Sequence, residues 1–140
     1  MKSTIVLFFM SFLLCFAAQA VFAQEFVEDE EKYGTGKVYT SPEFSASFPG
    51  GKERINEYVK MKLEMQDIDL GKSGMEGTFV AKYVIEANGK VENVYVAEGI
   101  SAELDDEITR ALISMPKWTP AKVGGEAVRS LQTYRLALSR

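Results

Sequence analysis

The sequence predicts an α+β domain in which two helices pack on one face of a three-stranded antiparallel sheet. Two segments place apolar residues at helical spacing, and three others alternate apolar and polar residues as strands do. Their order along the chain is helix, strand, strand, helix, strand, which keeps both helices on one side of an antiparallel sheet. A chain of 140 residues has the length of a single domain.

The first helix is predicted from Lys52 to Met65. It follows the turn Phe48-Pro49-Gly50-Gly51, where the proline ends an extended segment and the glycines let the chain change direction. The apolar residues of the helix form one stripe: Ile55, Tyr58, Val59 and Leu63. We interpret the turn as structural rather than as an anion site at a helix start.

Two strands are predicted on either side of Asn88-Gly89. The first alternates from Gly77 onward, and its apolar face is formed by Phe79, Ala81, Tyr83 and Ile85. Asn-Gly favours a two-residue turn of type I′, because both positions of that turn need positive φ.

Counting outward from this turn predicts the strand register. Tyr83 pairs with Val94 and Ala81 pairs with Val96, so the apolar faces of the two strands agree. Glu92 then falls opposite Ile85, and a β-bulge near the turn would bring the apolar Val91 there instead.

The second helix is predicted to begin at the capping residue Ser101 and to stop before Pro116. Its apolar stripe consists of Leu104, Ile108, Ala111, Leu112 and Met115. The acidic residues 105–107 suit the positive end of the helix dipole, so we interpret them as helix stabilisers and not as a cation site. Trp118, between the helix stop and Pro120, is predicted to cover the core.

The last strand is predicted from Val128 to Leu138, after the turn at Gly124-Gly125. Its apolar face is formed by Tyr134, Leu136 and Leu138, and Arg129, Thr133 and Arg135 lie on the opposite face.

The N-terminal part divides into two segments. Residues 1–23 are predicted to be a secretory signal, with an apolar run from Ile5 and small residues at the end of Val21-Phe22-Ala23; the alternative is an uncleaved membrane anchor. Residues 24–40 are acidic and poor in apolar side chains, which predicts a flexible tether. The domain itself is expected at residues 41–140.

Composition excludes several chemistries. The chain has no histidine, and its one cysteine, Cys15, lies in the predicted signal. Thiol catalysis, disulfides, Cys/His metal sites and histidine base catalysis are therefore not expected. We predict no catalytic, metal-binding or cofactor-binding residue and no enzyme, and a net charge of −4 argues against nucleic acid as a partner.

These turns and strands occur in an order that resembles the carboxy-terminal domain of the TonB family, in the short exported form common in Bacteroidetes-type bacteria. The resemblance covers about residues 41–138 and rests on Phe48-Pro49-Gly50-Gly51, Gly77, Asn88-Gly89, Val94-Tyr95-Val96, Leu104-Asp105, Met115-Pro116-Lys117-Trp118-Thr119-Pro120 and Tyr134-Arg135-Leu136. It implies the α-β-β-α-β arrangement of TonB and TolA carboxy-terminal domains. Three features depart from the family: Met65-Gln66-Asp67-Ile68 replaces a Tyr-Pro, Pro120-Ala121 stands where Trp-x-Pro-Gly is common, and no proline-rich spacer precedes the domain.

In this family the last strand is reported to be a free sheet edge that takes up a receptor segment, the TonB box, as an added strand. Backbone hydrogen bonds supply affinity in that mode, and alternate side chains supply selectivity. The resemblance implies that the partner-binding edge is formed by Val128, Arg129, Leu131, Thr133, Tyr134, Arg135 and Leu136. The residues alone leave open a strand that is simply paired or self-associated.

The implied function is binding of outer-membrane receptor peptides in energy-dependent transport, in the periplasm. The alternative is a stand-alone exported domain of the same fold with a different protein partner or a role in self-association. The implied partners are the receptor, a second copy of the chain as a homodimer, and inner-membrane motor proteins if the N-terminal segment stays as an inner-membrane anchor.

Overall fold

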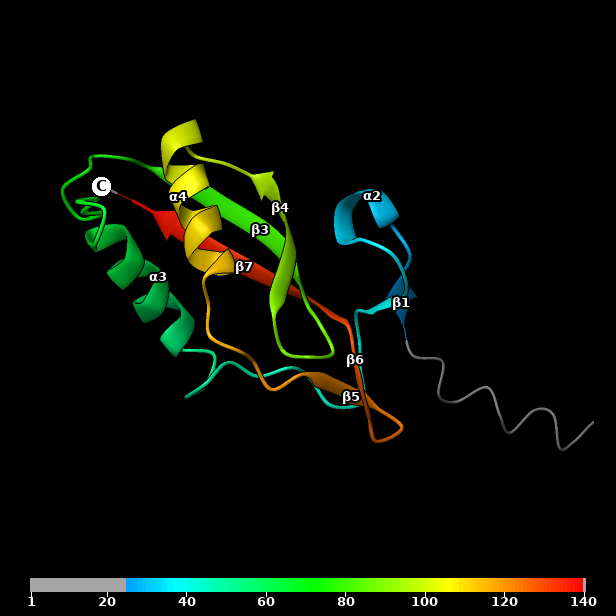
Figure 1. Ribbon diagram of the computed structural model, residues 1–140. Helices are drawn as coiled ribbons and strands as arrows, with labels where there is room; N and C mark the ends of the chain where they lie inside the picture. The colour runs from blue at the N-terminus through cyan, green and yellow to red at the C-terminus, as the bar shows by residue number, and fades with distance from the viewer. Residues whose placement is uncertain (1–24, 140) are drawn as a thin grey trace, which may run out of the picture.

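The computed structural model describes residues 25–139, which form a sheet layer and a helix layer (Figure 1). The elements follow in this order: β1 (Phe26–Val27), α2 (Glu30–Tyr33), β2 (Val38–Tyr39), α3 (Arg54–Glu64), β3 (Gly77–Ile85), β4 (Val91–Glu98), α4 (Ala102–Ile113), β5 (Ala121–Val123), β6 (Glu126–Val128) and β7 (Ser130–Leu138). The predicted signal at 1–23 lies outside the described residues. Within residues 25–139, no helix combines the length and the apolar character that a membrane crossing requires.

The main sheet has five strands in the order β1-β2-β7-β3-β4. The three predicted strands are present as β3, β4 and β7, and they pair antiparallel. Two short strands extend the sheet beyond β7, and β2 runs parallel to β7 where Tyr39 pairs with Ser130. The α+β class is confirmed, but the sheet is five-stranded and mixed rather than three-stranded and antiparallel.

The core lies between the helices and one face of β3 and β7. Both α3 and α4 contribute to it, which places them on the same face of the sheet (Figure 1). Its most deeply buried large side chains include Leu63 of α3, Leu104, Ile108 and Leu112 of α4, and Phe79, Tyr83 and Ile85 of β3. The predicted apolar stripes and the predicted face of β3 are therefore the buried ones.

The helix boundaries follow local capping chemistry. At α4, the Ser101 hydroxyl oxygen accepts a hydrogen bond from the Leu104 amide at 3.3 Å, as the predicted cap requires. The Asp105 carboxylate accepts a hydrogen bond from the Ile100 amide at 2.9 Å. Asp105 is one of the acidic residues that were predicted to stabilise the start of this helix. The helix predicted at 52–65 is shorter, from Arg54 to Glu64, and no side chain caps its start.

The turn between β3 and β4 differs from the predicted two-residue type I′ turn. The Gly89 amide donates to the Glu86 carbonyl at 2.8 Å, and the Glu86 amide donates to the Lys90 carbonyl at 2.8 Å. These bonds enclose a three-residue loop in which Gly89, but not Asn88, has positive φ. This is the pattern of a type I turn followed by a left-handed residue, which needs only one position of that kind.

The predicted bulge near this turn is confirmed. Ala81 pairs with Val96 as expected, and Ile85 pairs with Val91, with a register shift between Lys82 and Val84. Asn93 takes a φ of 52° at this shift, so the extra residue of β4 lies opposite Tyr83. Tyr83 therefore faces two residues of β4, Asn93 and Val94, instead of the predicted simple pair with Val94.

The prediction of a flexible tether at 24–40 is wrong for most of that segment. Residues 25–39, here called the N-terminal strap, form β1, α2 and β2 at one end of the sheet and cover part of the face opposite the helices (Figure 1). Tyr33 and Val38 of the strap are buried against Val84 of β3, with Leu131 beside them. The packing of the strap on the sheet could not be predicted from the sequence, because the apolar strap residues are few and widely spaced. Their partners also lie far along the chain.

The final predicted strand is divided in two. Glu126–Val128 forms β6, which makes a small hairpin with β5 around Gly124 and Gly125, and β7 begins only at Ser130. The residue between the two strands is Arg129, whose side chain and carbonyl both have specific partners.

Candidate binding edge

One side of β7 is open along most of its length. On its other side, β7 pairs with β3 throughout, from Ile85 opposite Ser130 to Gly77 opposite Leu138. On the open side, β2 reaches only Ser130, and no other described strand is a neighbour of β7. The sheet therefore has an unpaired edge from Leu131 to Leu138.

The direction of one hydrogen bond identifies which residues present their backbone at this edge. The Arg129 carbonyl accepts from the Tyr39 amide at 2.9 Å, so residue 129 points its backbone groups away from β3. The amide and carbonyl of successive strand residues point alternately to the two sides. The outward residues of β7 are therefore Leu131, Thr133, Arg135 and Ala137, while their even-numbered neighbours bond to β3.

A groove runs beside this edge, between β7 and the start of α3. Its volume is about 360 Å³, and it is lined by Lys52, Glu53, Ile55 and Asn56 on one side and by Thr133, Tyr134 and Arg135 on the other. The helix residues of this wall were not among the predicted site residues. No signal in the sequence marks them, because their position depends on how α3 crosses the end of the sheet.

The predicted site residues fall into three groups. Thr133 and Arg135 are exposed at the open edge. Tyr134 and Leu136 belong to the core side of the strand, where Tyr134 is 5 % exposed and lies 6.4 Å from the Phe79 ring between centroids. Leu131 is half-buried against the strap, and Val128 pairs with Ala121 in the small hairpin. Only part of the predicted set therefore offers side chains at the edge.

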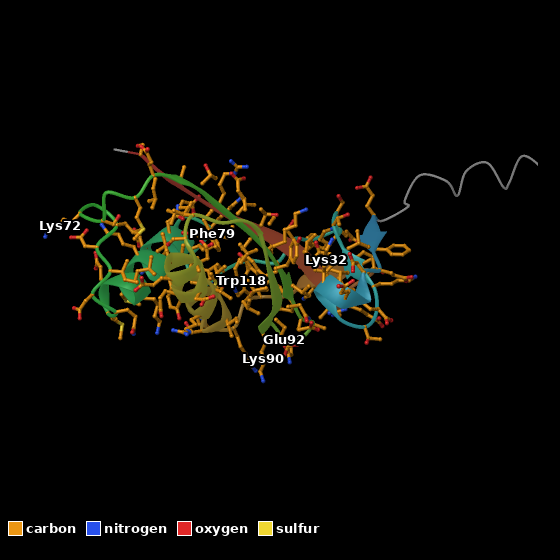
Figure 2. All side chains as sticks on the ribbon, turned by 90° about the horizontal axis from the view of Figure 1, so that it is seen from above. Lys32, Lys72, Phe79, Lys90, Glu92 and Trp118 are labelled. Atoms are coloured by element: carbon orange, nitrogen blue, oxygen red, sulfur yellow. The ribbon has the colours of Figure 1, made fainter. Side chains whose placement is uncertain are left out.

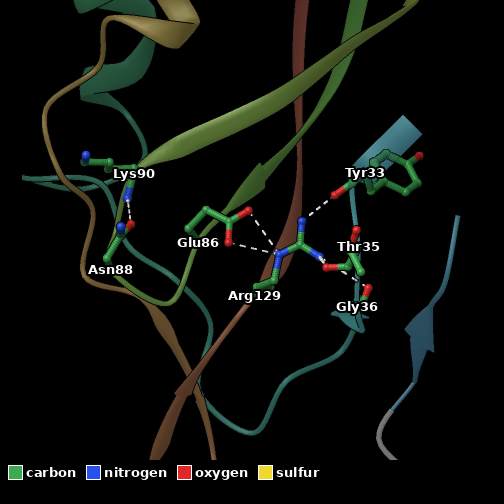
Figure 3. A network of polar contacts seen from close by, with 7 residues as sticks. All are labelled: Tyr33, Thr35, Gly36, Glu86, Asn88, Lys90 and Arg129. Carbon is green, nitrogen blue, oxygen red and sulfur yellow. Dashed lines mark hydrogen bonds and ion pairs between the residues drawn. The ribbon is translucent and has the colours of Figure 1, made fainter. Parts of the chain in front are cut away.

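Arg129 does not contribute its side chain to the edge. Its Nε donates to both Glu86 carboxylate oxygens at 3.0 Å, and its Nη1 donates to the carbonyls of Thr35 and Gly36 at 2.8 and 3.2 Å (Figure 3). Its Nη2 donates to the Tyr33 carbonyl. The Arg129 and Glu86 side chains are 15 % and 18 % exposed, so this ion pair is largely removed from water. Arg129 therefore holds the strap on the sheet, which corrects its assignment as a partner-binding side chain.

Burial raises the pKa of the two tyrosines behind the edge. Loss of hydration raises the pKa of Tyr134 to about 12. Burial, with a smaller contribution from Tyr134, also raises the pKa of Tyr83. These phenols carry no charge near neutral pH. Residues 25–139 also contain no group of three or more His, Cys, Asp or Glu side chains arranged to hold a metal ion.

Comparisons with known proteins relate this chain to one family. Residues 70–136, from just before β3 to near the end of β7, match the family model described as Gram-negative bacterial TonB protein C-terminal. Among solved structures, the chain is similar to the NMR solution structure of Helicobacter pylori TonB-CTD, at 18 % identity over 66 % of this chain and 88 % of that chain, with a TM-score of 0.34. A comparison with curated proteins found no match.

The family match agrees with the absence of catalytic residues expected from the composition. TonB C-terminal domains are protein-binding domains and not enzymes. The match includes β7, on which the open edge lies, together with both strands of the hairpin and α4. Residues 70–136 of this chain therefore resemble the C-terminal domain of TonB proteins.

Proposed function

We propose that this protein is a periplasmic TonB-like binding domain that takes up an extended segment of an outer-membrane receptor, the TonB box, as an added strand on β7. The observation that carries this proposal is the open edge from Leu131 to Leu138. In energy-dependent transport, such a contact would connect the receptor to motor proteins of the inner membrane if the N-terminal segment anchors the chain there.

The geometry of the edge suits strand addition. Thr133, Arg135 and Ala137 present backbone donors and acceptors along one line with no neighbouring strand, and an incoming strand would bond to them as β3 does on the other side. The groove beside α3 leaves space for the side chains that such a strand directs toward the helix layer. Arg135 places a charge on the open strand, which disfavours uncontrolled pairing of edges between molecules.

A peptide titration tests the proposal. We expect synthetic eight-residue TonB-box peptides, added to ¹⁵N-labelled protein, to shift the amide resonances of Thr133, Arg135 and Ala137 more than those of β4. Absence of any peptide-dependent shift at millimolar concentration would contradict strand addition. Concentration-dependent dimerisation through the same amides without peptide, measured by sedimentation, would instead support the alternative role in self-association.

A proline substitution separates backbone pairing from side-chain contact. Arg135→Pro removes one outward N–H but no hydrogen bond to β3, and edge strands accept proline. We expect it to weaken peptide binding by about tenfold or more, whereas Arg135→Ala keeps the N–H and should bind within about threefold of the unchanged protein. Equal binding by both variants would show that the peptide does not pair with this edge.

A further inference from the structure

Two depressions of different size adjoin β7 on its helix side. One is the groove of about 360 Å³ beside the start of α3, and the other is a cavity of about 100 Å³ that is more enclosed, here called the small cavity. Lys52, Ile55 and Thr133 line both of them. The groove and the small cavity are therefore neighbours along the strand.

The register of β7 places the two depressions two residues apart. Gln132 lines only the small cavity, and Tyr134 lines only the groove. Tyr134 belongs to the core, and Gln132 pairs with Tyr83, which also belongs to the core. Both residues therefore face the helix side, because paired residues share a face and alternate residues of a strand do as well. A strand added to β7 would direct the side chains opposite Gln132 and Tyr134 to that same side.

The small cavity has an apolar inner wall. The buried residues that line it, each at most 6 % exposed, are Phe48, Ile55, Tyr83 and Trp118. Figure 2 shows Trp118 within the body of the molecule. The other lining residues, with Gln132 and Thr133 among them, are half-buried or exposed, so the opening lies on their side.

The size and lining of the small cavity limit what can enter it. A volume of about 100 Å³ equals the share of roughly three water molecules, which matches a side chain of about three heavy atoms and is too small for an aromatic ring. The apolar wall disfavours a charged group, because a buried ion loses its hydration. A small uncharged side chain therefore fits best.

The groove is wider, and charged side chains line it. Lys52 and Arg135 contribute two positive charges and Glu53 contributes one negative charge, and all three residues are exposed. Within residues 25–139, none of the three forms an ion pair. The start of α3 adds the positive potential of a helix N-terminus. The groove therefore favours a long acidic side chain over a basic one.

We propose that the edge of β7 selects a two-position pattern in the added strand: a small uncharged side chain, of alanine to valine size, opposite Gln132, and a long acidic side chain opposite Tyr134. The inference rests on the proposed strand addition to β7. One residue separates the two positions, because a strand presents every second side chain to the same face. The pattern holds for a parallel or an antiparallel added strand, since both keep alternate side chains on one face.

A positional scan tests the pattern. The host is the TonB-box peptide that gives the largest amide shifts at Thr133 and Arg135, and alanine, valine, leucine, phenylalanine, glutamate and lysine replace each of its positions in turn. We expect titration to find one position at which valine binds about tenfold more tightly than phenylalanine. Two residues away, glutamate should bind about three- to fivefold more tightly than lysine. High salt should weaken the second preference and not the first.

A matched pair of variants tests the small cavity. Ile55→Val removes one methyl group from its wall, so the affinity for leucine relative to valine at the size-selective position should rise by about threefold. Ile108→Val makes the same change in the core of α4, where the residue does not line the small cavity, and should leave this ratio unchanged. Equal ratios in the two variants would show that the small cavity does not receive the side chain.

A second pair of variants tests the groove. Lys52→Glu reverses one charge of its lining, so the preference for glutamate over lysine should change to a preference for lysine. Lys60→Glu makes the same change on α3, lines neither depression and should keep the preference for glutamate. A preference for glutamate that survives in Lys52→Glu would exclude the groove as its source.

The outcomes distinguish this inference from the proposed function. Strand addition that lacks either preference, or that shows the two preferences at positions not separated by one residue, would overturn the pattern and leave strand addition standing. Absence of peptide-dependent shifts at β7 would overturn both.

Discussion

At the scale of single residues, Gly89 connects the hairpin to the core. Its carbonyl accepts the Trp118 amide, and a Cβ built at this position would lie 2.2 Å from the Trp118 carbonyl oxygen. Its φ of 86° is also one that residues with side chains rarely adopt. The glycine therefore serves the turn and the close approach of two backbones together.

Replacing this glycine should be far more damaging than replacing a glycine with similar φ elsewhere. In Gly89→Ala, the alanine must adopt a left-handed backbone conformation, and its Cβ clashes with the backbone of Trp118. We expect this substitution to lower the free energy of unfolding by about 2–4 kcal/mol. Gly124→Ala is the matched control, because its φ is 61° and nothing lies within 4 Å of the added Cβ; it should cost only about 1–2 kcal/mol. Urea unfolding measures both, and equal losses would show that contact with Trp118 is not the cause.

At the scale of elements, the strap and β7 are joined by the side chain and backbone of Arg129. The guanidinium binds the strap carbonyls and Glu86, and the Arg129 carbonyl accepts from Tyr39 in β2. The strap thereby pairs with the start of β7 and limits the open edge to the residues beyond Ser130. One residue therefore contributes both to docking of the strap and to the point where the open edge begins.

Removing the Arg129 side chain should release the strap while the rest of the sheet stays folded. Arg129→Ala leaves the largely buried Glu86 carboxylate without its cation, and undocking the strap gives that carboxylate access to water. We expect amide hydrogen exchange at Tyr39 to accelerate by at least about tenfold, with β3 unaffected. Arg135→Ala, which removes an exposed arginine from the same part of the chain, is the control. Unchanged protection of Tyr39 in Arg129→Ala would show that the apolar contacts alone hold the strap.

At the scale of the whole molecule, the stability of the protein at alkaline pH depends on the burial of the core tyrosines. The pKa of Tyr134 is raised from 10.0 to about 12 by loss of hydration, and burial raises that of Tyr83 as well. Between pH 10 and 12 the unfolded chain loses these protons while the folded protein retains them, so stability is fully present below pH 10 and is lost above it. Urea midpoints should be level up to about pH 9 and then fall, and Tyr134→Phe should reduce the fall. A midpoint that stays level up to pH 12 would contradict the burial of these phenols.

Much of the fold could be read from local patterns. The buried stripe of α4 with its Ser101 cap, the inward face of β3 and the bulge opposite Tyr83 all follow from periodicity or turn chemistry, which involve residues close together in the chain. The turn at Asn88-Gly89 was located correctly but assigned the wrong type. Whether one or two residues take positive φ there depends on the loop length, and the hydrogen bonds of the neighbouring strands set that length.

The candidate site could be predicted only in part. The exposed residues Thr133 and Arg135 lie on the open edge, but the role expected for Arg129 was wrong because Glu86 and the strap take up its side chain. The helix wall of the groove and the cavity at Trp118 were missed. Each of these features joins segments that are distant in the sequence, and no spacing rule relates them.

The sequence by itself determined the α+β class, the two amphipathic helices, the antiparallel hairpin and the exclusion of histidine and thiol chemistry. Those conclusions depend on residue types and on periods of two or 3.6 residues, which are local properties. Only the tertiary structure decided that the strap covers part of the second face, that β7 keeps an open edge beyond Ser130, and that a groove walled by α3 lies beside that edge. These features follow from which surfaces remain to be covered once the helices and the sheet have packed, and packing brings together residues that the chain keeps far apart.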